Sequence, residues 1–222
     1  MFEQKKDTTM LNNRKLPIGI QDFEDLRTNE YLYVDKTAYI YQLKTRGKPY
    51  FLGRPRRFGK SLFLSTLKAF FLGKKELFEG LAIAGLEKEW IEYPVFYLDF
   101  NLEDYSTLSS FHYALDANLV ELEARWGSDE REKTPALRLN GLIRRACEQT
   151  GRKVVVLVDE YDKPLIETMD NAKLNETIRK RLKGFYGVLK RADANLRFVF
   201  LTGVTKFSQV SVFSDLNHLV DI

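Results

Sequence analysis

The chain reads Tyr50-Phe-Leu-Gly-Arg-Pro-Arg-Arg-Phe-Gly-Lys-Ser-Leu-Phe-Leu64 at the point that decides its fold. A short apolar strand runs into a tight basic loop that ends in Gly59-Lys60-Ser61, and an apolar helix follows at once. This order of strand, basic glycine-containing loop and helix is the layout of a nucleoside-triphosphate phosphate loop. The segment therefore predicts an α/β protein with a phosphate site at the start of a helix.

Each residue of the tripeptide supplies a different part of that chemistry. Gly59 lets the backbone pass close to the phosphates, and Lys60 places a cation beside the β- and γ-phosphates. Ser61 offers its hydroxyl to Mg²⁺. The N-terminus of the following helix adds unpaired N–H groups and the positive end of its dipole. We therefore expect the backbone from Arg57 to Ser61 to hold the phosphates.

The loop departs from the usual pattern at one position. The pattern G-x-x-x-x-G-K-[ST] places its first glycine at position 54, where this chain has Arg54, and Gly53 lies one residue too early. A G-K-S tripeptide also occurs in surface turns that precede helices, where Lys60 would simply be solvated. On this segment alone both interpretations stay open.

A second segment, Lys153-Val-Val-Val-Leu-Val-Asp-Glu-Tyr-Asp162, favours the nucleotide interpretation. Its five consecutive apolar residues indicate a strand buried on both faces of a parallel sheet. Carboxylates at the carboxyl end of such a strand lie where ligands bind open α/β sheets. We expect Asp159 to hold Mg²⁺ opposite Ser61, and Glu160 to orient or deprotonate the attacking water. A strand that merely stops at an acidic turn has the same pattern, but the order of the two segments favours a nucleotide site.

The rest of the chain alternates strands with helices. Strands are expected over 93–100 and 196–203, and helices over 61–72, 109–126, 136–149 and 173–190. Such alternation implies right-handed crossovers and a three-layer α/β sandwich with a mostly parallel sheet. An extra strand between the phosphate-loop strand and the Asp-Glu strand is typical of phosphate-loop ATPases of the additional-strand, catalytic-glutamate type. Thr202 lies where that type keeps a γ-phosphate sensor, although threonine is also ordinary at a strand end.

Composition limits the classes of protein that fit. The 222 residues, 44% of them hydrophobic, can bury one full core, and no apolar run approaches the length that spans a membrane. The single cysteine, Cys147, excludes an internal disulfide framework and fits a reducing, cytoplasmic location. The net charge of +4 is mild, and nucleotide phosphates account for the basic loop. Basic residues 179–181 are interpreted as the exposed face of a helix.

Four segments of the chain form, in their order, a further recognisable pattern. They are Leu16-Pro-Ile-Gly-Ile-Gln-Asp-Phe-Glu-Asp-Leu-Arg27 with Tyr31-Leu-Tyr-Val-Asp-Lys-Thr37, the loop Arg54-Pro-Arg-Arg-Phe-Gly-Lys-Ser61, Val158-Asp-Glu-Tyr-Asp-Lys-Pro164, and Phe200-Leu-Thr-Gly-Val-Thr-Lys-Phe-Ser208 with Val212-Phe-Ser-Asp-Leu-Asn217. In this order, over about residues 16–222, they resemble the bacterial AAA-ATPase-like family. That family has its own phosphate loop, in which arginine replaces the first glycine, so the resemblance accounts for Arg54.

The resemblance implies the nucleotide and the residues that handle it. It implies ATP with Mg²⁺, and no guanine-specifying N-K-x-D motif is present in the sequence. The expected nucleotide-binding residues are Arg54, Arg56, Arg57, Phe58, Gly59, Lys60, Ser61 and Leu62; the expected Mg²⁺ ligands are Ser61 and Asp159; and the expected catalytic residues are Lys60, Glu160 and Thr202. No arginine finger can be assigned, because either a loop arginine or a partner subunit could supply it.

The resemblance also implies parts of a longer protein. Members of the family commonly carry a helical lid and a C-terminal nuclease-like domain of the PD-(D/E)XK type, through which DNA would be a partner. We expect residues 1–15 to form a flexible tail and residues 16–222 an ATPase domain that stops before the lid and the nuclease-like domain. ATP hydrolysis would then control an attached or partner effector, and an oligomer is compatible with this arrangement.

Other interpretations stay open beside this one. One is a nucleotide switch that does not hydrolyse its ligand, and another is a nucleic-acid-binding module whose basic loop contacts backbone phosphates. The opening segment also allows two roles. Ile18, Ile20 and Phe23 either pack on adenine, with Asp35 or Lys36 near the ribose or phosphates, or belong to a cap whose aromatic residues are core.

Overall fold

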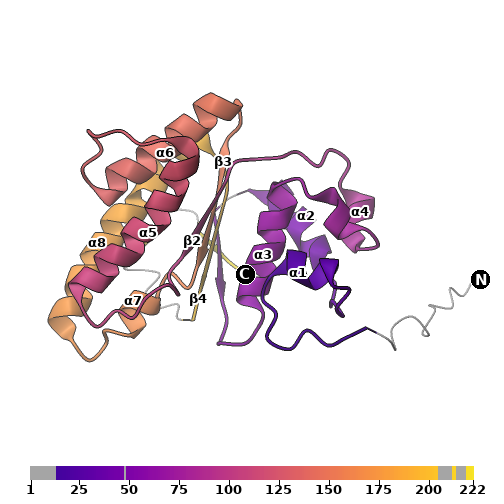
Figure 1. Ribbon diagram of the computed structural model, residues 1–222, viewed down its shortest axis with the longest axis horizontal. Coiled ribbons are helices and arrows are strands. Elements are labelled where there is room, and N and C mark those ends of the chain that lie inside the picture. The colour runs from indigo at the N-terminus through magenta and orange to yellow at the C-terminus, as the bar shows by residue number, and fades with distance from the viewer. Residues whose placement is uncertain (1–13, 48, 205–211, 214–218) are drawn as a thin grey trace, which may run out of the picture.

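The fold is a five-stranded parallel sheet with helices on both faces (Figure 1). The computed structural model describes residues 14–47, 49–204, 212–213 and 219–222. The strand order across the sheet is β2-β3-β4-β1-β5, and every neighbouring pair is parallel. The strands are β1 (Tyr50–Gly53), β2 (Val95–Asp99), β3 (Val154–Asp159), β4 (Leu196–Gly203) and β5 (Val220–Asp221).

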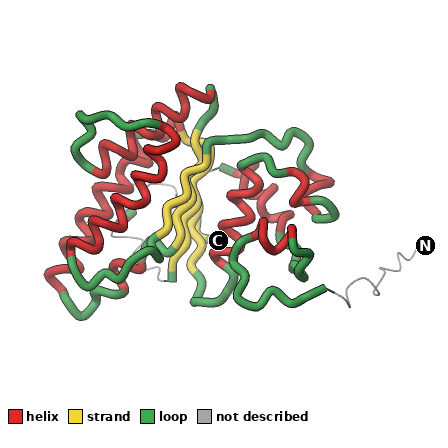
Figure 2. Tube along the Cα trace, viewed as in Figure 1, coloured by secondary structure: helices red, strands yellow, loops and turns green. Residues whose placement is uncertain are grey.

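The helices form one layer on each face of the sheet, as the red coils on either side of the yellow strands show (Figure 2). One layer holds α1 (Phe23–Thr28), α2 (Thr37–Arg46), α3 (Lys60–Phe71) and α4 (Ala82–Leu86). The other holds α5 (Leu108–Trp126), α6 (Pro135–Thr150), α7 (Lys163–Ile166) and α8 (Ala172–Arg191). Within the described residues, no helix is both long and apolar enough to cross a membrane.

The residues of β3 before Asp159 are apolar because helices cover the sheet on both of its faces. All six residues of this strand are buried. Val154, Val156 and Val158 pack in the core under α5, α6 and α8, whereas Val155 and Leu157 pack in the core under α3. Successive side chains of a strand point to opposite faces, so a strand covered on both sides must be apolar throughout. The first polar residue, Asp159, therefore marks the point where the strand leaves the core.

Local sequence signals set the ends of the helices that flank the sheet. The side chain of Thr107 accepts a hydrogen bond from the N–H of Ser110 at the start of α5, and the side chain of Thr134 does the same for Leu137 at the start of α6. These are N-cap contacts, which satisfy amides that lack a partner in the first turn. Gly151 ends α6 in the left-handed conformation, with φ of 66°.

The expected α/β fold class is confirmed. The four helices that the sequence predicts are α3, α5, α6 and α8, with each end within one residue of the prediction. The position of one strand in the sheet differs from the prediction. The strand predicted at 93–100 is β2, which lies at the edge of the sheet, whereas β4 lies between β1 and β3. The additional strand of this sheet is therefore the one that carries Thr202. The predicted tail lies almost wholly outside the described residues, as do residues 205–211 and 214–218.

Two glycines in α8 give a prediction about stability. Gly184 and Gly187 lie inside this helix, and a Cβ built on either meets no atom within 4 Å. Glycine in a helix interior is less stable than alanine by about 0.5–1 kcal/mol. We therefore expect Gly184→Ala/Gly187→Ala to raise the free energy of unfolding by about 1–2 kcal/mol in urea denaturation.

A third helical glycine is the matched control for this prediction. A Cβ on Gly141 of α6 would lie 1.7 Å from Oε1 of Glu132, so this carboxylate would have to move from its ion pair with Arg145, and Gly141→Ala should stabilise the protein less than the changes in α8 do. A double variant of α8 that unfolds at lower urea concentration than the wild type would contradict the prediction.

Candidate functional site

The loop between β1 and α3 has the backbone form that anion sites use. Two of its residues are left-handed, Arg57 with φ of 66° and Gly59 with φ of 74°. Gly59 is the N-cap of α3, and its carbonyl accepts the N–H of Phe63 at 3.0 Å. Left-handed residues let successive amides converge on one point, and the first amides of a helix have no partner within it. The loop can therefore offer several N–H groups to one anion.

Lys60 lies inside the site. The residue is 4% exposed, and its Nζ donates to the carbonyls of Arg54 at 3.0 Å and Pro55 at 3.3 Å. Oε1 of Glu160 lies 3.0 Å from the same Nζ. A buried ammonium needs such partners because removal of its charge from water is otherwise costly. The alternative of a solvated Lys60 in a surface turn is therefore wrong.

Asp159 is held by the strands on both sides of β3. This last residue of β3 is 2% exposed. Its Oδ1 accepts the hydroxyl of Thr202 from β4 at 2.5 Å, and its Oδ2 accepts the hydroxyl of Tyr97 from β2 at 3.3 Å. Burial, together with the charge of Asp159, raises the pKa of Tyr97, so the phenol stays protonated and able to donate. Two donors thus fix the direction of the Asp159 carboxylate.

Glu160 leaves the strand in a strained conformation. Its φ of 51° is uncommon for a residue that is not glycine, and such strain concentrates at functional positions. Its N–H donates to Oγ1 of Thr202 at 3.2 Å. Burial raises the pKa of Glu160 above its ordinary value, and the contact with Lys60 counteracts this in part. The backbone turn therefore brings the carboxylate of Glu160 to the phosphate-loop lysine.

Asp99 is a second carboxylate at the same edge of the sheet. It ends β2 and stands directly opposite Asp159 in the register of the two strands. Burial, reinforced by the charge of Asp159, raises the pKa of Asp99. Asn118 of α5 fixes the backbone here, because its Oδ1 accepts the N–H of Asp99 at 2.8 Å and its Nδ2 donates to the carbonyl of Asp99 at 2.9 Å. The end of β2 is thus tied to a helix.

A single cavity of about 1260 Å³ joins these groups. Of the predicted site residues, those that line it are Arg56, Arg57, Gly59, Lys60, Ser61, Leu62, Asp159 and Glu160. Three others lie elsewhere: Phe58 is 68% exposed, Arg54 is exposed and contributes its carbonyl to Lys60, and Thr202 is fully buried beneath Asp159 and Glu160. The cavity therefore brings the phosphate loop and the carboxyl edge of β3 together, with Thr202 behind them.

The opening segment divides between the cavity and the core. Residues 18–22 line the cavity, whereas Phe23 is fully buried and its ring packs edge-on against Tyr33. Asp35 accepts hydrogen bonds from the N–H of Thr37 and the N–H of Ala82, so it ties α2 to α4. The core interpretation is therefore right for Phe23 and the structural one for Asp35. Lys36 is exposed and does not line the cavity, whereas Ile18 and Ile20 do line it.

Sequence reasoning missed several polar residues that line the cavity, among them Tyr97, Asp99 and Lys163. Nζ of Lys163 donates to the carbonyls of Asn101 at 3.3 Å and Glu103 at 3.2 Å, which joins the segment after β2 to α7. A signal was present, because Asp99 ends an apolar strand as Asp159 does. The register that brings the two strand ends together becomes known only from the structure.

The hydroxyl of Thr202 gives a second prediction. Thr202→Val keeps the shape of the side chain but removes the donor to Asp159 and the acceptor for the N–H of Glu160. A buried polar group left without a partner costs about 1–3 kcal/mol, so we expect the free energy of unfolding to fall by about that amount. Urea denaturation would measure the change, and Thr202→Ser, which keeps the hydroxyl, should lose less. Equal stability of the valine variant and the wild type would contradict this.

The oxygen atoms in the cavity suit a Mg²⁺ ion that is bound together with phosphates. Ser61, Asp99 and Asp159 all line it. In the part of the chain that the structure describes, no three His, Cys, Asp or Glu side chains gather into a metal cage. Mg²⁺ in nucleotide sites usually keeps several waters and takes one or two carboxylates plus phosphate oxygens. The residues present therefore fit this ion in this kind of site.

Fold and site together define the core of a phosphate-loop NTPase. The strand order places β4 between β1 and β3, and the phosphate loop faces the carboxyl end of β3 across one cavity. A family profile described as "Predicted AAA-ATPase" matches residues 17–213. The chain therefore belongs to this AAA-ATPase-like family.

One curated relative is similar over nearly the whole chain. It is a protein of Azotobacter chroococcum mcd 1 described as "Uncharacterized protein in vnfD 5'region", and it is 41% identical over 213 residues. The match covers 96% of this chain and 41% of the relative, so the chain spans less than half of that protein's length. No solved structure matches the chain.

Proposed function

We propose that this chain hydrolyses ATP at the γ-phosphate with Mg²⁺. The observation that supports this best is the single cavity in which Lys60, Asp159 and Glu160 meet. Phosphoryl transfer needs mainly positioning and charge stabilisation, and these residues supply a cation, a metal-binding carboxylate and a base. The family match supports a nucleotide as the ligand.

The phosphate loop would bind the triphosphate through its backbone amides and Lys60. The ammonium of Lys60 already lies 3.0 Å from a carboxylate oxygen, which a phosphate oxygen can replace as its partner. Such charge-assisted hydrogen bonds are about twice as strong as neutral ones. Ser61 and Asp159 would hold Mg²⁺, which when bound neutralises charge on the phosphates.

Glu160 would act as the base that orients and deprotonates the attacking water. Its ion pair with Lys60 couples this role to binding, because a phosphate that takes over Lys60 leaves the carboxylate of Glu160 free to accept a proton. Thr202 would be a positioning residue, since it touches both Asp159 and the backbone of Glu160 from outside the cavity.

The base of the nucleotide would lie against residues 18–22. This segment borders the cavity beside α3, and Ser65 of α3 anchors it. Oγ of Ser65 accepts the N–H of Phe23 at 2.8 Å and donates to Oδ2 of Asp22 at 3.1 Å. Ile18 and Ile20 would offer apolar surface to an adenine ring. ATP hydrolysis would control an effector in a longer protein or a partner, for which a nuclease-like domain acting on DNA is our proposal.

Calorimetric titration with Mg-ATP and with a non-hydrolysable analogue, followed by measurement of phosphate release, tests the proposal. We expect both nucleotides to bind and only ATP to release phosphate. Binding without phosphate release in single-turnover conditions would instead establish a nucleotide switch. Absence of binding for both nucleotides would overturn the proposed site.

Asp99 gives a prediction about the metal. Asp99→Asn removes a negative charge beside Asp159, and we expect about tenfold more Mg²⁺ to be needed for half-maximal ATP binding. The free energy of unfolding without metal should stay the same or rise at pH 7, because burial disfavours the charged form of Asp99 in the folded state. Titration of Mg²⁺ at fixed ATP would measure the first effect. Asp170→Asn, at an exposed carboxylate, is the control, and an unchanged Mg²⁺ requirement in Asp99→Asn would contradict the prediction.

A further inference from the structure

One helix carries more positive charge than the whole chain. α8 has seven basic residues and one acidic residue, a net charge of +6, whereas the chain as a whole has +4. The rest of the chain therefore sums to −2. The helix lies in the layer opposite α3 and the phosphate loop (Figure 1). Nucleotide phosphates in the cavity cannot account for this charge.

Five of the seven cations of α8 have no carboxylate partner among the described residues, and four of these five lie within residues 181–191. Arg181, Lys183, Lys190 and Arg191 are all exposed, and no Asp or Glu oxygen that the structure describes lies within 4.0 Å of their charged nitrogens. Lys180 differs, since its Nζ lies 3.3 Å from Oε1 of Glu176. Unpaired cations along one helix attract polyanions.

Gly184 and Gly187 lie between these cations, and because they have no side chains the backbone of α8 is uncovered there. Two hollows, of about 790 and about 520 Å³, meet here and share Lys180, Gly184 and Arg191. Gly187 extends the floor of the second hollow. Because a Cβ at either glycine would meet no atom of the described residues within 4 Å, packing within that part of the chain does not require glycine here. We call this continuous depression, lined by residues 180–191 of α8, the α8 groove.

An exposed aromatic side chain borders the α8 groove. Tyr113 of α5 is 62% exposed and lines the same hollow as Arg181. The acidic residue of this lining, Asp116, is paired with Arg138 at 2.5 Å, so it does not neutralise α8. Sites for single-stranded nucleic acids combine cations along the backbone with aromatic rings on which bases stack.

We propose that the α8 groove binds a single-stranded nucleic acid. The helix from Lys180 to Arg191 is about 16 Å long, so its unpaired cations are spread over a length that several phosphates of one strand can follow. Arg181, Lys183, Lys190 and Arg191 contact phosphates, and Tyr113 stacks on a base. An acidic protein segment would satisfy the cations but leave the exposed ring without a partner.

Fluorescence anisotropy of a labelled 12-nucleotide strand tests this. Four neutralised phosphates predict a slope of log K against log salt of about −3 for a single strand. Lys183→Gln/Lys190→Gln/Arg191→Gln should lower this slope to about −1 and weaken binding in low salt. Tyr113→Ala should weaken binding about tenfold while the slope stays the same.

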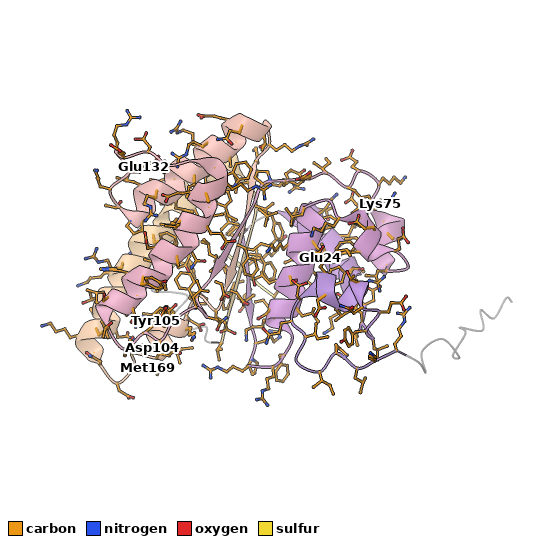
Figure 3. The ribbon with its side chains drawn as sticks, viewed as in Figure 1. Glu24, Lys75, Asp104, Tyr105, Glu132 and Met169 are labelled. Carbon is orange, nitrogen blue, oxygen red and sulfur yellow. The ribbon has the colours of Figure 1, made fainter. Side chains whose placement is uncertain are left out.

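The control removes the same charge from the other layer. Lys75→Gln/Lys88→Gln/Arg46→Gln replaces two lysines and one arginine that are exposed there, and Lys75 lies beyond α3 on the side away from α8 (Figure 3). This variant should bind the strand as the wild type does, and unfolding midpoints would verify that both triple variants are folded. Equal loss in both triple variants, or loss in Arg56→Gln/Arg57→Gln instead, would overturn the α8 groove as the site. Competition by polyglutamate as effective as that by unlabelled strand would overturn nucleic acid as the occupant.

Discussion

Lys60→Ala should lower the affinity for Mg-ATP by about 30-fold or more, because truncating one member of a buried charge pair costs about 2–5 kcal/mol. The loss has two causes. The phosphates lose their cation, and the negative charge of Glu160, which Lys60 no longer offsets, stays in the same cavity and repels them. Titration calorimetry of the folded variant would measure the change.

A matched control separates this loss from a general effect of charge. Lys75→Ala removes an exposed lysine from the same helix layer and should bind Mg-ATP as the wild type does. Circular dichroism of Lys60→Ala would establish that the variant is folded. Nearly unchanged ATP affinity in a folded Lys60→Ala variant would refute the assignment of the phosphate loop.

Glu160→Gln should retain ATP binding but lower turnover by about 10²- to 10⁴-fold, the usual contribution of a general base. Glutamine has nearly the same shape, and its carbonyl oxygen can still accept a hydrogen bond from Lys60. It cannot take a proton from water, so only the chemical step should suffer. Single-turnover phosphate release, beside calorimetric titration of the same sample, would separate the two quantities.

Glu167→Gln is the control for this variant. Glu167 lines the same cavity, and its carboxylate accepts the N–H of Tyr105 at 3.2 Å, a contact that glutamine can keep. Turnover should therefore change little. If Glu160→Gln hydrolysed ATP at the wild-type rate, another group would have to be the base, and Asp99 would be the next candidate because it lines the same cavity.

Sequence patterns predicted the fold because local and tertiary signals agree. The apolar run at Val154–Val158 predicts a strand covered on both faces, and α8 begins and ends within one residue of the range 173–190 that its apolar periodicity predicts. The sequence predicts a phosphate loop despite Arg54, because Gly59-Lys60-Ser61 and Asp159-Glu160 together form a pattern of two distant segments, and the structure brings both segments to one cavity. These features can be predicted because each depends on the types of its own residues and on their neighbours along the chain.

Other parts of the site depend on register and could not be predicted. Asp99 matters because β2 pairs with β3 so that residue 99 faces residue 159. Thr202 was predicted to sense a phosphate, but β4 places its hydroxyl under Asp159, so its proposed role changes to positioning. A one-residue shift in either pairing would have turned these side chains to the opposite face of the sheet.

The two hydrogen bonds of Asn118 to the backbone of Asp99 join α5 to the cavity edge of the sheet. On its inner side the helix grips both backbone polar groups of Asp99, and on its outer side it presents Tyr113. Asn118 also anchors itself through a bond from Nδ2 to the carbonyl of Ala114 at 2.8 Å, so its side chain moves with the helix. If a ligand bound at the α8 groove changed the tilt of α5, the hydrogen bonds of Asn118 to Asp99 would therefore move the end of β2 and displace the carboxylate of Asp99 relative to Asp159.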